Sequence, residues 1–277
     1  MQKTTKIKIQ SLLLIVVLLL CFFGSAYKAL FSVKQITACF SYWNGEPPTE
    51  LLASFSTYYS QTDKGRCENL SLAAKRIDGV LLQPYGDFSF NQTVGKRTKT
   101  AGFRQAKVIL NGEFVLGIGG GVCQVSTTLY NAAILSGLWV TEFHNHSLPV
   151  SYVPPSCDAM VSSESDLKIC NAHPFSVRFF ASAKNGTLTV SLYGQKIAEK
   201  YKLVSQTLGT VEAGDPIVVY GDEERVVREA RQGIQSEGYL ERYKNGVLLE
   251  RKLIRKDTYA AQPAIVKKIA DTTKKIG

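Results

Sequence analysis

The sequence predicts an α+β fold, a mostly antiparallel sheet with two helices, followed by a small all-β module. Apolar residues recur at helical spacing in only two stretches of the exported part. Short alternating segments separated by Asn-Gly turns occupy much of the rest, as in antiparallel hairpins. Beyond Gln195 no helical pattern persists and charge density rises. With 277 residues and an apolar fraction of 45%, the chain can bury a core, which excludes global disorder.

The first 34 residues have the composition of a secretory signal peptide or a signal anchor. Three lysines precede an apolar run over residues 11–23, and small residues follow at 24–26. This run is short for a membrane span, although residues 26–31 could extend it past Lys28. Either form places the remainder of the chain outside the cytoplasm. Residues 35–50 are expected to form a linker that ends in a Pro- and Gly-containing cluster.

An α+β domain is expected over residues 51–194. Its first half should contain, in order, a strand over 51–60, a helix over about 68–78, strands over 80–82 and 88–90, and a hairpin with arms 108–110 and 114–116. Gly79 is placed to end the helix, and Asn111-Gly112 to turn the hairpin. The second arm of the hairpin runs directly into a glycine-rich stretch.

This stretch, residues 117–121, contains four glycines in five positions and leads into the second helix. Apolar residues recur after it at helical spacing, and Gly137 is placed to cap the helix end. Cys123 is therefore expected in the first turn, where unpaired N–H groups and the helix dipole lower a thiol pKa. The alternative is that Cys123 is a small buried residue packed against a tight turn.

The second half of the domain is expected to be strand-rich. The expected elements are strands over 139–143, 167–170, 175–181 and 187–193, with an extended segment over 148–155. A separate all-β module is expected over 195–262, with strand-like segments at 218–220, 238–243 and 247–254, and a polar tail over 263–277.

A cysteine at a helix N-terminus and a histidine on a neighbouring strand can form a thiolate–imidazolium nucleophile. Two of the three histidines in the chain, His144 and His146, are delivered by the strand at 139–143 and are expected on one side of it, because Cβ direction repeats every two residues. Cys123 would attack a carbonyl, and one histidine would carry the proton to the leaving amine. Asp158 could orient the histidine, although Asn145 or Glu142 could also serve. The N–H groups of residues 120–124 could receive the oxyanion.

Candidate substrate contacts lie in two places. Arg97 and Arg104, in a basic loop, could bind a substrate carboxylate or could be ordinary surface charge. The others are at the start of the second helix: Gly120, Gly121, Gln124 and Ser126.

Two other interpretations of the same residues involve no covalent chemistry. Cys123, His144, His146 and Asp158 could be zinc ligands, but no short Cys-x-x-Cys or His-Glu-x-x-His spacing is present. The glycine loop could bind phosphate, but no P-loop lysine or serine follows it. We therefore expect no metal and no cofactor.

The formal net charge of +10 favours anionic partners. Export and the lack of aromatic–basic alternation argue against nucleic acid, so an anionic cell wall or membrane surface, or solvent alone, is expected to face these charges.

Of six cysteines, Cys21 lies in the apolar segment. The other four besides Cys123 can pair in three ways, leaving Cys123 free, or all can be reduced. These four are Cys39, Cys67, Cys157 and Cys170.

Several long motifs resemble the VanW-like family, over about residues 54–194. They comprise residues 88–91, 94–98, 102–103, 111–112, 117–131, 144–154 and 158–159. Residues 197–260 are similar to the five-glycine (G-five) β modules often appended to this family, through Gly233, Gly238 and Asn245-Gly246. The chain departs from the family at Asn145, where members commonly have proline, and at Ser156-Cys157, where they have Gly-Arg. A Cys157–Cys170 disulfide would change the edge of the candidate site beside Asp158.

The resemblance implies a Gram-positive cell-envelope protein, membrane-anchored or secreted, of a family first linked to glycopeptide resistance. Some members are reported as L,D-transpeptidases with an essential cysteine. By this resemblance Cys123 would attack the carbonyl after the third residue of a peptidoglycan stem peptide and release D-Ala, with His146 favoured over His144 as the base. An amine of a neighbouring stem, or water, would resolve the thioester. The alternative is a non-catalytic peptidoglycan-binding or scaffolding protein.

Overall fold

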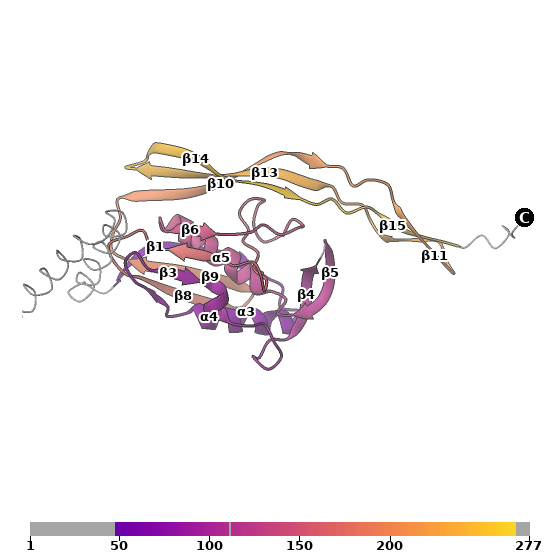
Figure 1. Cartoon of the computed structure of the whole chain (residues 1–277), viewed down its shortest axis with the longest axis horizontal. Coiled ribbons are helices and arrows are strands. Elements are labelled where there is room, and N and C mark those ends of the chain that lie inside the picture. Colours follow the sequence, from indigo (N-terminus) through magenta and orange to yellow (C-terminus); the bar gives the residue numbers. More distant parts are fainter. Residues whose placement is uncertain (1–47, 111, 270–277) are drawn as a thin grey trace, which may run out of the picture.

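The computed structural model describes residues 48–110 and 112–269. The expected signal segment, most of the linker and the end of the expected tail lie outside these residues. No helix in the described ranges is long and apolar enough to cross a membrane. The expected fold class is confirmed: mostly antiparallel sheet with helices, then an all-β region (Figure 1).

A four-stranded antiparallel sheet in the order β1-β9-β8-β2 forms the centre of the first domain. Its strands are β1 (Glu50–Tyr58), β2 (Leu81–Leu82), β8 (Val177–Lys184) and β9 (Thr187–Gly194). Helix α3 (Lys64–Ile77) packs against β8, and α5 (Val122–Leu135) packs against β1, β9 and α3. Every second residue of β9 is buried, so Leu188, Val190 and Leu192 face the helices in one apolar core.

Helix α5 is buried on nearly all sides, with 12 of its 14 residues buried. Polar residues on it bond to the residues on either side of Asp158, the aspartate expected to orient the histidine. Asn131 donates to the Cys157 carbonyl at 2.8 Å, and the Ser126 hydroxyl donates to the Ala159 carbonyl at 2.6 Å. The Ala159 N–H donates to Thr127 at 2.9 Å. These bonds hold Asp158 against the same helix that carries Cys123.

Smaller elements surround this core. The sheet β3-β7-β6 consists of β3 (Asp87–Ser89), β7 (Lys168–Cys170) and β6 (Trp139–Glu142), and β4 (Gln105–Leu110) pairs with β5 (Glu113–Ile118) as the expected hairpin. The strand expected over 88–90 ends at Ser89, which caps the unexpected helix α4 (Phe90–Val94) by accepting from the Gln92 N–H. No strand forms in the segment 148–155.

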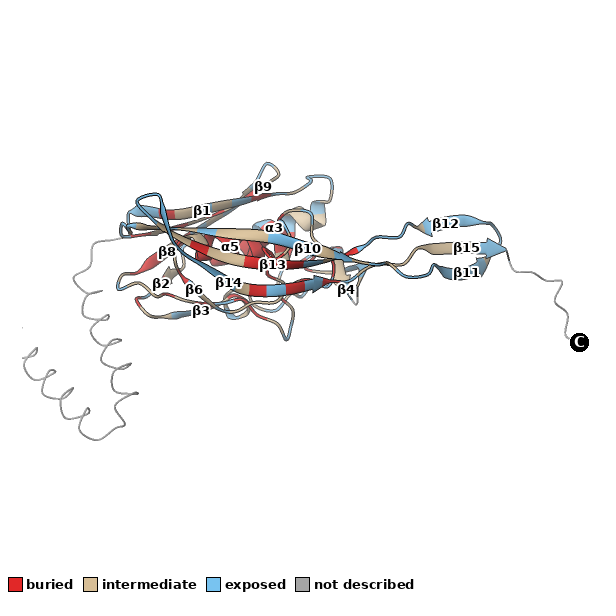
Figure 2. Ribbon diagram, turned by 90° about the horizontal axis from the view of Figure 1, so that it is seen from above, coloured by how far each residue is buried: buried red, intermediate tan, exposed pale blue. Residues whose placement is uncertain are grey.

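Two three-stranded sheets form the C-terminal part. The first is β10-β13-β14, made of β10 (Glu199–Val211), β13 (Gly233–Lys244) and β14 (Val247–Tyr259). The second is β11-β15-β12, made of β11 (Ile217–Gly221), β12 (Arg225–Arg228) and β15 (Ile265–Ile269). The long sheet lies along the first domain and the second sheet extends past it (Figures 1 and 2). Sequence patterns missed β10, β12 and β15, and β15 lies inside the expected polar tail.

Candidate active site

The glycine turn places Cys123 at the second position of α5. Gly121 is the N-cap residue with φ of 108°, a conformation that favours glycine. At Gly120 a Cβ atom would stand 2.5 Å from the Lys107 carbonyl oxygen, so a larger residue would force β4 away. The turn therefore delivers the partly exposed Cys123 to the positive end of a buried helix.

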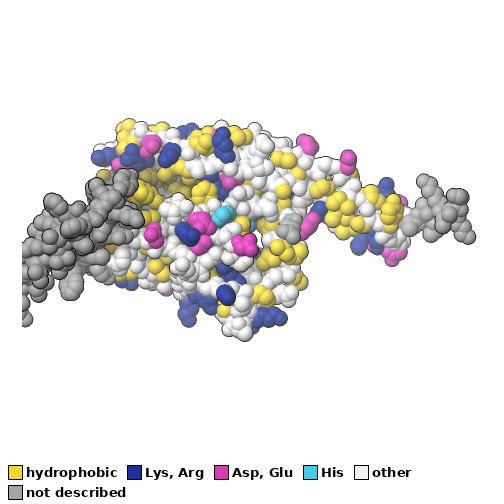
Figure 3. All heavy atoms as spheres, in the orientation of Figure 1, with side chains coloured by type: hydrophobic (Ala, Val, Ile, Leu, Met, Phe, Trp, Pro, Cys, Tyr) yellow, Lys and Arg dark blue, Asp and Glu magenta, His cyan; other side chains and the backbone are white. Residues whose placement is uncertain are grey.

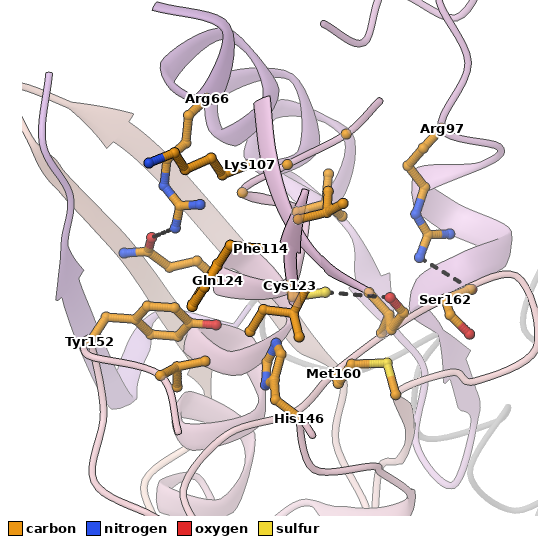
Figure 4. A pocket seen from close by; sticks show the side chains of 18 of the residues that line it. Arg66, Arg97, Lys107, Phe114, Cys123, Gln124, His146, Tyr152, Met160 and Ser162 are labelled. Carbon is orange, nitrogen blue, oxygen red and sulfur yellow. Dashed lines mark hydrogen bonds between the residues drawn. The ribbon is translucent and has the colours of Figure 1, made fainter. Parts of the chain in front are cut away.

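His146 lies beside Cys123 (Figure 4), and Asp158 is bonded to His146. The Asp158 carboxylate accepts from His146 Nδ1 at 2.6 Å and from the His146 backbone N–H at 2.7 Å, both through Oδ2. Because Nδ1 is bonded to Asp158, Nε2 is the ring nitrogen of His146 left for the neighbouring Cys123. The Cys123 thiol donates to the Val161 carbonyl at 3.3 Å. Asp158 is fully buried and His146 is 4% exposed.

The three groups shift one another's pKa values. Burial raises the pKa of the Cys123 thiol, but the hydrogen bond and positive charge of His146 outweigh burial and hold that pKa below its ordinary value. Burial opposes charge on His146 as well, yet its bonds to Asp158 and Cys123 raise its pKa to about 9. Asp158, despite burial, keeps a lowered pKa because His146 and Tyr259 donate to it. This arrangement favours a thiolate–imidazolium pair.

The backbone around Cys123 offers donors for a developing oxyanion. Among residues 120–124, the N–H groups of Val122 and Gln124 donate to the Gly119 and Gly121 carbonyls. The N–H groups of Gly120, Gly121 and Cys123 have no acceptor among the described residues. The expected oxyanion site is thus narrowed to three donors.

His144 lies apart from Cys123, His146 and Asp158. Strand β6 ends at Glu142, so the alternation expected to place both histidines on one face stops before them. The His144 ring instead bonds to Glu142 at 3.1 Å and is 41% exposed.

In the described ranges, no group of three or more His, Cys, Asp and Glu side chains is arranged so that it could hold a metal ion.

Cys123 opens onto a cavity of about 980 Å³. Of the expected substrate contacts, Arg97, Gly120, Gly121 and Gln124 line it. Arg104 does not, because it pairs with Glu68 at 2.8 Å on the surface. Ser126 does not line it either, because it is fully buried and bonded to Ala159.

Five lysine and arginine side chains line the cavity: Arg66, Lys96, Arg97, Lys107 and Arg231. None of them has an acidic partner within 4 Å among the described residues. The acidic group in the lining is Asp63, whose carboxylate caps α3 by accepting from the Arg66 backbone N–H at 2.9 Å. Sequence reasoning identified only Arg97 as a substrate contact. Lys96 is its neighbour in the same basic loop, whereas Arg66, Lys107 and Arg231 come from distant elements and carry no local signal.

The other described cysteines differ from Cys123. Cys157 and Cys170 are thiols in this structure, so the Cys157–Cys170 disulfide considered above is absent. Burial raises the pKa of each to about 11, which makes them poor nucleophiles near neutral pH. Cys67 is also a thiol, whereas Cys39 and Cys21 lie outside the described residues.

The fold and the site define a class of protein: an α+β domain in which a cysteine at the start of a buried helix meets a His–Asp pair. Residues 65–193 match the family model of the VanW like protein, and residues 204–268 match that of the G5 domain. Residues 65–193 therefore form a VanW-like domain and residues 204–268 a G5 domain, as the motifs of the sequence indicated. Both domains are typical of bacterial cell-envelope proteins.

Two curated relatives align over the first domain. An uncharacterized protein, YoaR of Bacillus subtilis (strain 168), is 39% identical over 150 residues, which are 54% of this chain and 50% of YoaR. The vancomycin B-type resistance protein VanW of Enterococcus faecalis (strain ATCC 700802 / V583) is 26% identical over 165 residues, 57% of this chain and 60% of VanW. The chain thus spans about half the length of these relatives.

Solved structures give weaker similarities. The G5 domain of IgA1 protease is 18% identical with a TM-score of 0.19, covering 26% of this chain and 92% of that domain. The HP0197-G5 structure is 15% identical with a TM-score of 0.16, covering 27% and 99%. The G5 assignment therefore rests on the match to the family model.

Proposed function

We propose that this protein is a cysteine acyltransferase of the cell envelope, an L,D-transpeptidase or carboxypeptidase acting on peptidoglycan stem peptides. The observation that supports this most is the position of Cys123 at a helix N-terminus, beside a His146–Asp158 pair and three free N–H donors. This is the set of groups that acyl transfer through a thioester requires.

The first half-reaction begins when the Cys123 thiolate attacks the carbonyl carbon after the third stem residue. The new C–S bond pushes the carbonyl electron pair onto oxygen, where the N–H groups of Gly120, Gly121 and Cys123 stabilise the charge. The C–N bond then breaks while His146 Nε2 gives its proton to the leaving amine of D-Ala. A thioester on Cys123 and a neutral His146 remain.

The second half-reaction reverses these proton movements. The neutral imidazole accepts a proton from an incoming amine, or from water, as that group attacks the thioester carbon. The C–S bond breaks, and the products are a cross-linked or trimmed peptide, the Cys123 thiolate and the His146 imidazolium. Asp158, held at 2.6 Å from Nδ1, keeps the imidazole in the tautomer that both steps need.

The charges of the cavity support an anionic substrate. Arg97 lies on one side of Cys123, while Arg66 and Lys107 lie together on the other (Figure 4). Arg97 is oriented by Asn91 at 2.8 Å and Arg66 by Gln124 at 2.7 Å, so both guanidinium groups are held toward the cavity. We assign these cations to substrate carboxylates on the two sides of the scissile bond, as a stem peptide ending in D-Ala would present them.

A covalent adduct tests the proposal. The purified exported region is incubated with a disaccharide tetrapeptide, and intact-protein and peptide mass spectrometry follow. We expect the mass of the acyl fragment on Cys123, and none in Cys123→Ala. Cys170→Ser, which removes a thiol outside the cavity, should retain the adduct. A folded protein that acquires no adduct on Cys123 would contradict the proposal.

The competing function is a non-catalytic peptidoglycan-binding or scaffolding protein. The unpaired cations of the cavity also suit this role, because they bind anionic peptides without any chemistry. Equilibrium binding of the tetrapeptide to wild type and to Cys123→Ala, with unaltered muropeptides in both cases, would support it.

A further inference from the structure

The second oxygen of the Asp158 carboxylate faces the C-terminal sheet. While Oδ2 bonds to His146, Oδ1 accepts from the Tyr259 hydroxyl at 2.5 Å and lies 3.5 Å from Arg255 Nη2. Arg255 also donates through Nη1 to the Asp158 backbone carbonyl at 2.7 Å. Both residues are on β14, about a hundred positions along the chain from Asp158.

These two side chains are themselves held in place. Tyr259 is 1% exposed, and its oxygen accepts from the Ser156 N–H at 2.7 Å, so the hydroxyl proton is left to point at Asp158. The guanidinium of Arg255 donates to Asp257 at 2.6 Å and lies 4.7 Å from the centre of the Phe143 ring. Gly238 on β13 makes room for it, since a Cβ there would stand 2.7 Å from Arg255 Cγ.

We propose that Tyr259 and Arg255 are positioning residues of the candidate active site, and that the C-terminal sheet is a structural part of it. This inference rests on the proposed role of Cys123 and His146. A buried carboxylate stays ionised only when its oxygens are bonded to donors or paired with cations. Tyr259 and Arg255 do this on the side opposite His146, which leaves Oδ2 aimed at Nδ1.

Loss of the Tyr259 hydroxyl would act through the proton on His146. Without it, Oδ1 loses its donor and the Asp158 carboxylate is no longer held with Oδ2 aimed at Nδ1. The bond that keeps His146 protonated weakens, the pKa of His146 falls, and the Cys123 thiolate loses its counter-ion. The thiol is therefore protonated at a higher pH than in the wild type.

Further contacts join the same two parts of the chain. The Ala260 N–H donates to the Ser147 carbonyl at 2.7 Å, directly after His146 in sequence. Gln262 donates to the Gly112 carbonyl at 2.7 Å at the tip of the β4–β5 hairpin. Arg231, which precedes β13, lines the cavity. The C-terminal part thus contributes to both the charge pair and the cavity wall.

The test is the pH profile of Cys123 alkylation by iodoacetamide in the full exported chain, quantified on the Cys123 peptide by mass spectrometry. This measures the thiolate fraction without any substrate. In Tyr259→Phe we expect the acid limb to move up by about one pH unit, which is about a tenfold fall in rate along that limb. The other titratable or charged groups near the trio are Arg66, Arg97, Tyr130, Tyr152, Cys157 and Asp257.

A matched control and a double variant separate positioning from folding. The Tyr239 hydroxyl donates to Glu237 at 2.5 Å in the same sheet, away from Asp158, so Tyr239→Phe should leave the profile unchanged. Arg255→Lys keeps the positive charge but not the planar set of guanidinium donors, and should shift the acid limb of the alkylation profile less than Arg255→Met. In an Asp158→Asn background, Tyr259→Phe should add no further shift.

The outcomes distinguish this inference from the proposed function. If wild-type Cys123 is alkylated like an ordinary thiol, the thiolate–imidazolium pair and the proposed function both fail. Suppose that the acid limb of the wild-type alkylation profile lies at a lowered pH. If Tyr259→Phe does not shift this limb, or shifts it by the same amount in the Asp158→Asn background, only the positioning role is overturned. Thermal unfolding of each variant confirms that the folded protein was measured.

Discussion

The core of the first domain and its interface with the C-terminal sheet bury side chains of opposite character. In the core, Leu129, Phe179 and Leu188 are fully buried among apolar neighbours. At the interface the buried side chains include Asp158, Arg255, Asp257 and Tyr259, joined by hydrogen bonds and ion pairs. Apolar burial stabilises a fold, whereas buried ion pairs contribute little net stability and instead set geometry. The first region therefore keeps the domain folded, and the second orients its chemistry.

The largest effect is expected at the interface, from Asp158→Asn. A neutral amide favours the wrong tautomer of His146, and the equivalent change in a Ser-His-Asp triad lowers turnover by about 10⁴-fold. We expect the rate of acyl-adduct formation to fall by about 10³- to 10⁴-fold, measured by quenched-time-course mass spectrometry. A loss no larger than the change in folded fraction would show that this region is only structural.

Leu129→Ala, in the core, should lower stability and leave the chemistry of Cys123 unchanged. Truncating a fully buried leucine lowers the free energy of unfolding by about 2–5 kcal/mol, measured by urea denaturation. The alkylation profile of Cys123 in the folded protein should stay as in the wild type. If it shifted, the division between a stabilising core and an orienting interface would be wrong.

The pH dependence of stability should also separate the two regions. The pKa of His146 rises from its ordinary value of 6.5 to about 9 in the fold, so protonation stabilises the native state by roughly 3 kcal/mol. This contribution is complete below pH 6.5 and is lost as pH rises through 9. The stability that the ionised Asp158 contributes, because its pKa is lowered in the fold, is present above pH 3.8 and is lost as the pH falls through its lowered pKa.

Urea unfolding of wild type and His146→Gln across this alkaline range checks the sign. The wild-type free energy of unfolding should fall between pH 6.5 and 9, and the variant's should fall less. Parallel curves for the two proteins would mean that His146 is not charged in the fold.

The smallest effect concerns the cavity cations. Arg66→Gln removes a cation that lacks an acidic partner, and should raise KM for the tetrapeptide about tenfold with little change in kcat. Arg104→Gln is the matched control, because Arg104 pairs with Glu68 outside the cavity and should leave both constants unchanged. Equal effects of the two substitutions would count against carboxylate binding in the cavity.

Sequence patterns identified the elements whose signals are local. The glycine turn, the helix after it and the place of Cys123 follow from glycine spacing and apolar periodicity, and the family resemblance follows from several motifs along residues 88–159. The choice between His144 and His146 needed the structure, because it depends on where β6 ends. The orientation of Asp158 toward His146 likewise depends on bonds from α5.

The contribution of β14 had no local signal at all. Arg255, Asp257 and Tyr259 alternate along the strand, a pattern that ordinarily indicates the solvent face of a sheet. Here that face is the buried one, because it meets Asp158 from a segment about a hundred residues earlier. Long-range pairing of polar groups cannot be recognised from a hydrophobic pattern.

The buried cluster at the interface has balanced charge. The His146 imidazolium and Arg255 offset Asp158 and Asp257, and water reaches none of these four side chains freely. Mobile ions screen solvent-exposed charges within a Debye length, about 8 Å in physiological saline, but have little access to such an interior. Raising ionic strength should therefore weaken the capture of anionic peptides by the cavity rim while the nucleophile keeps its reactivity, so that salt alone separates binding from chemistry in this protein.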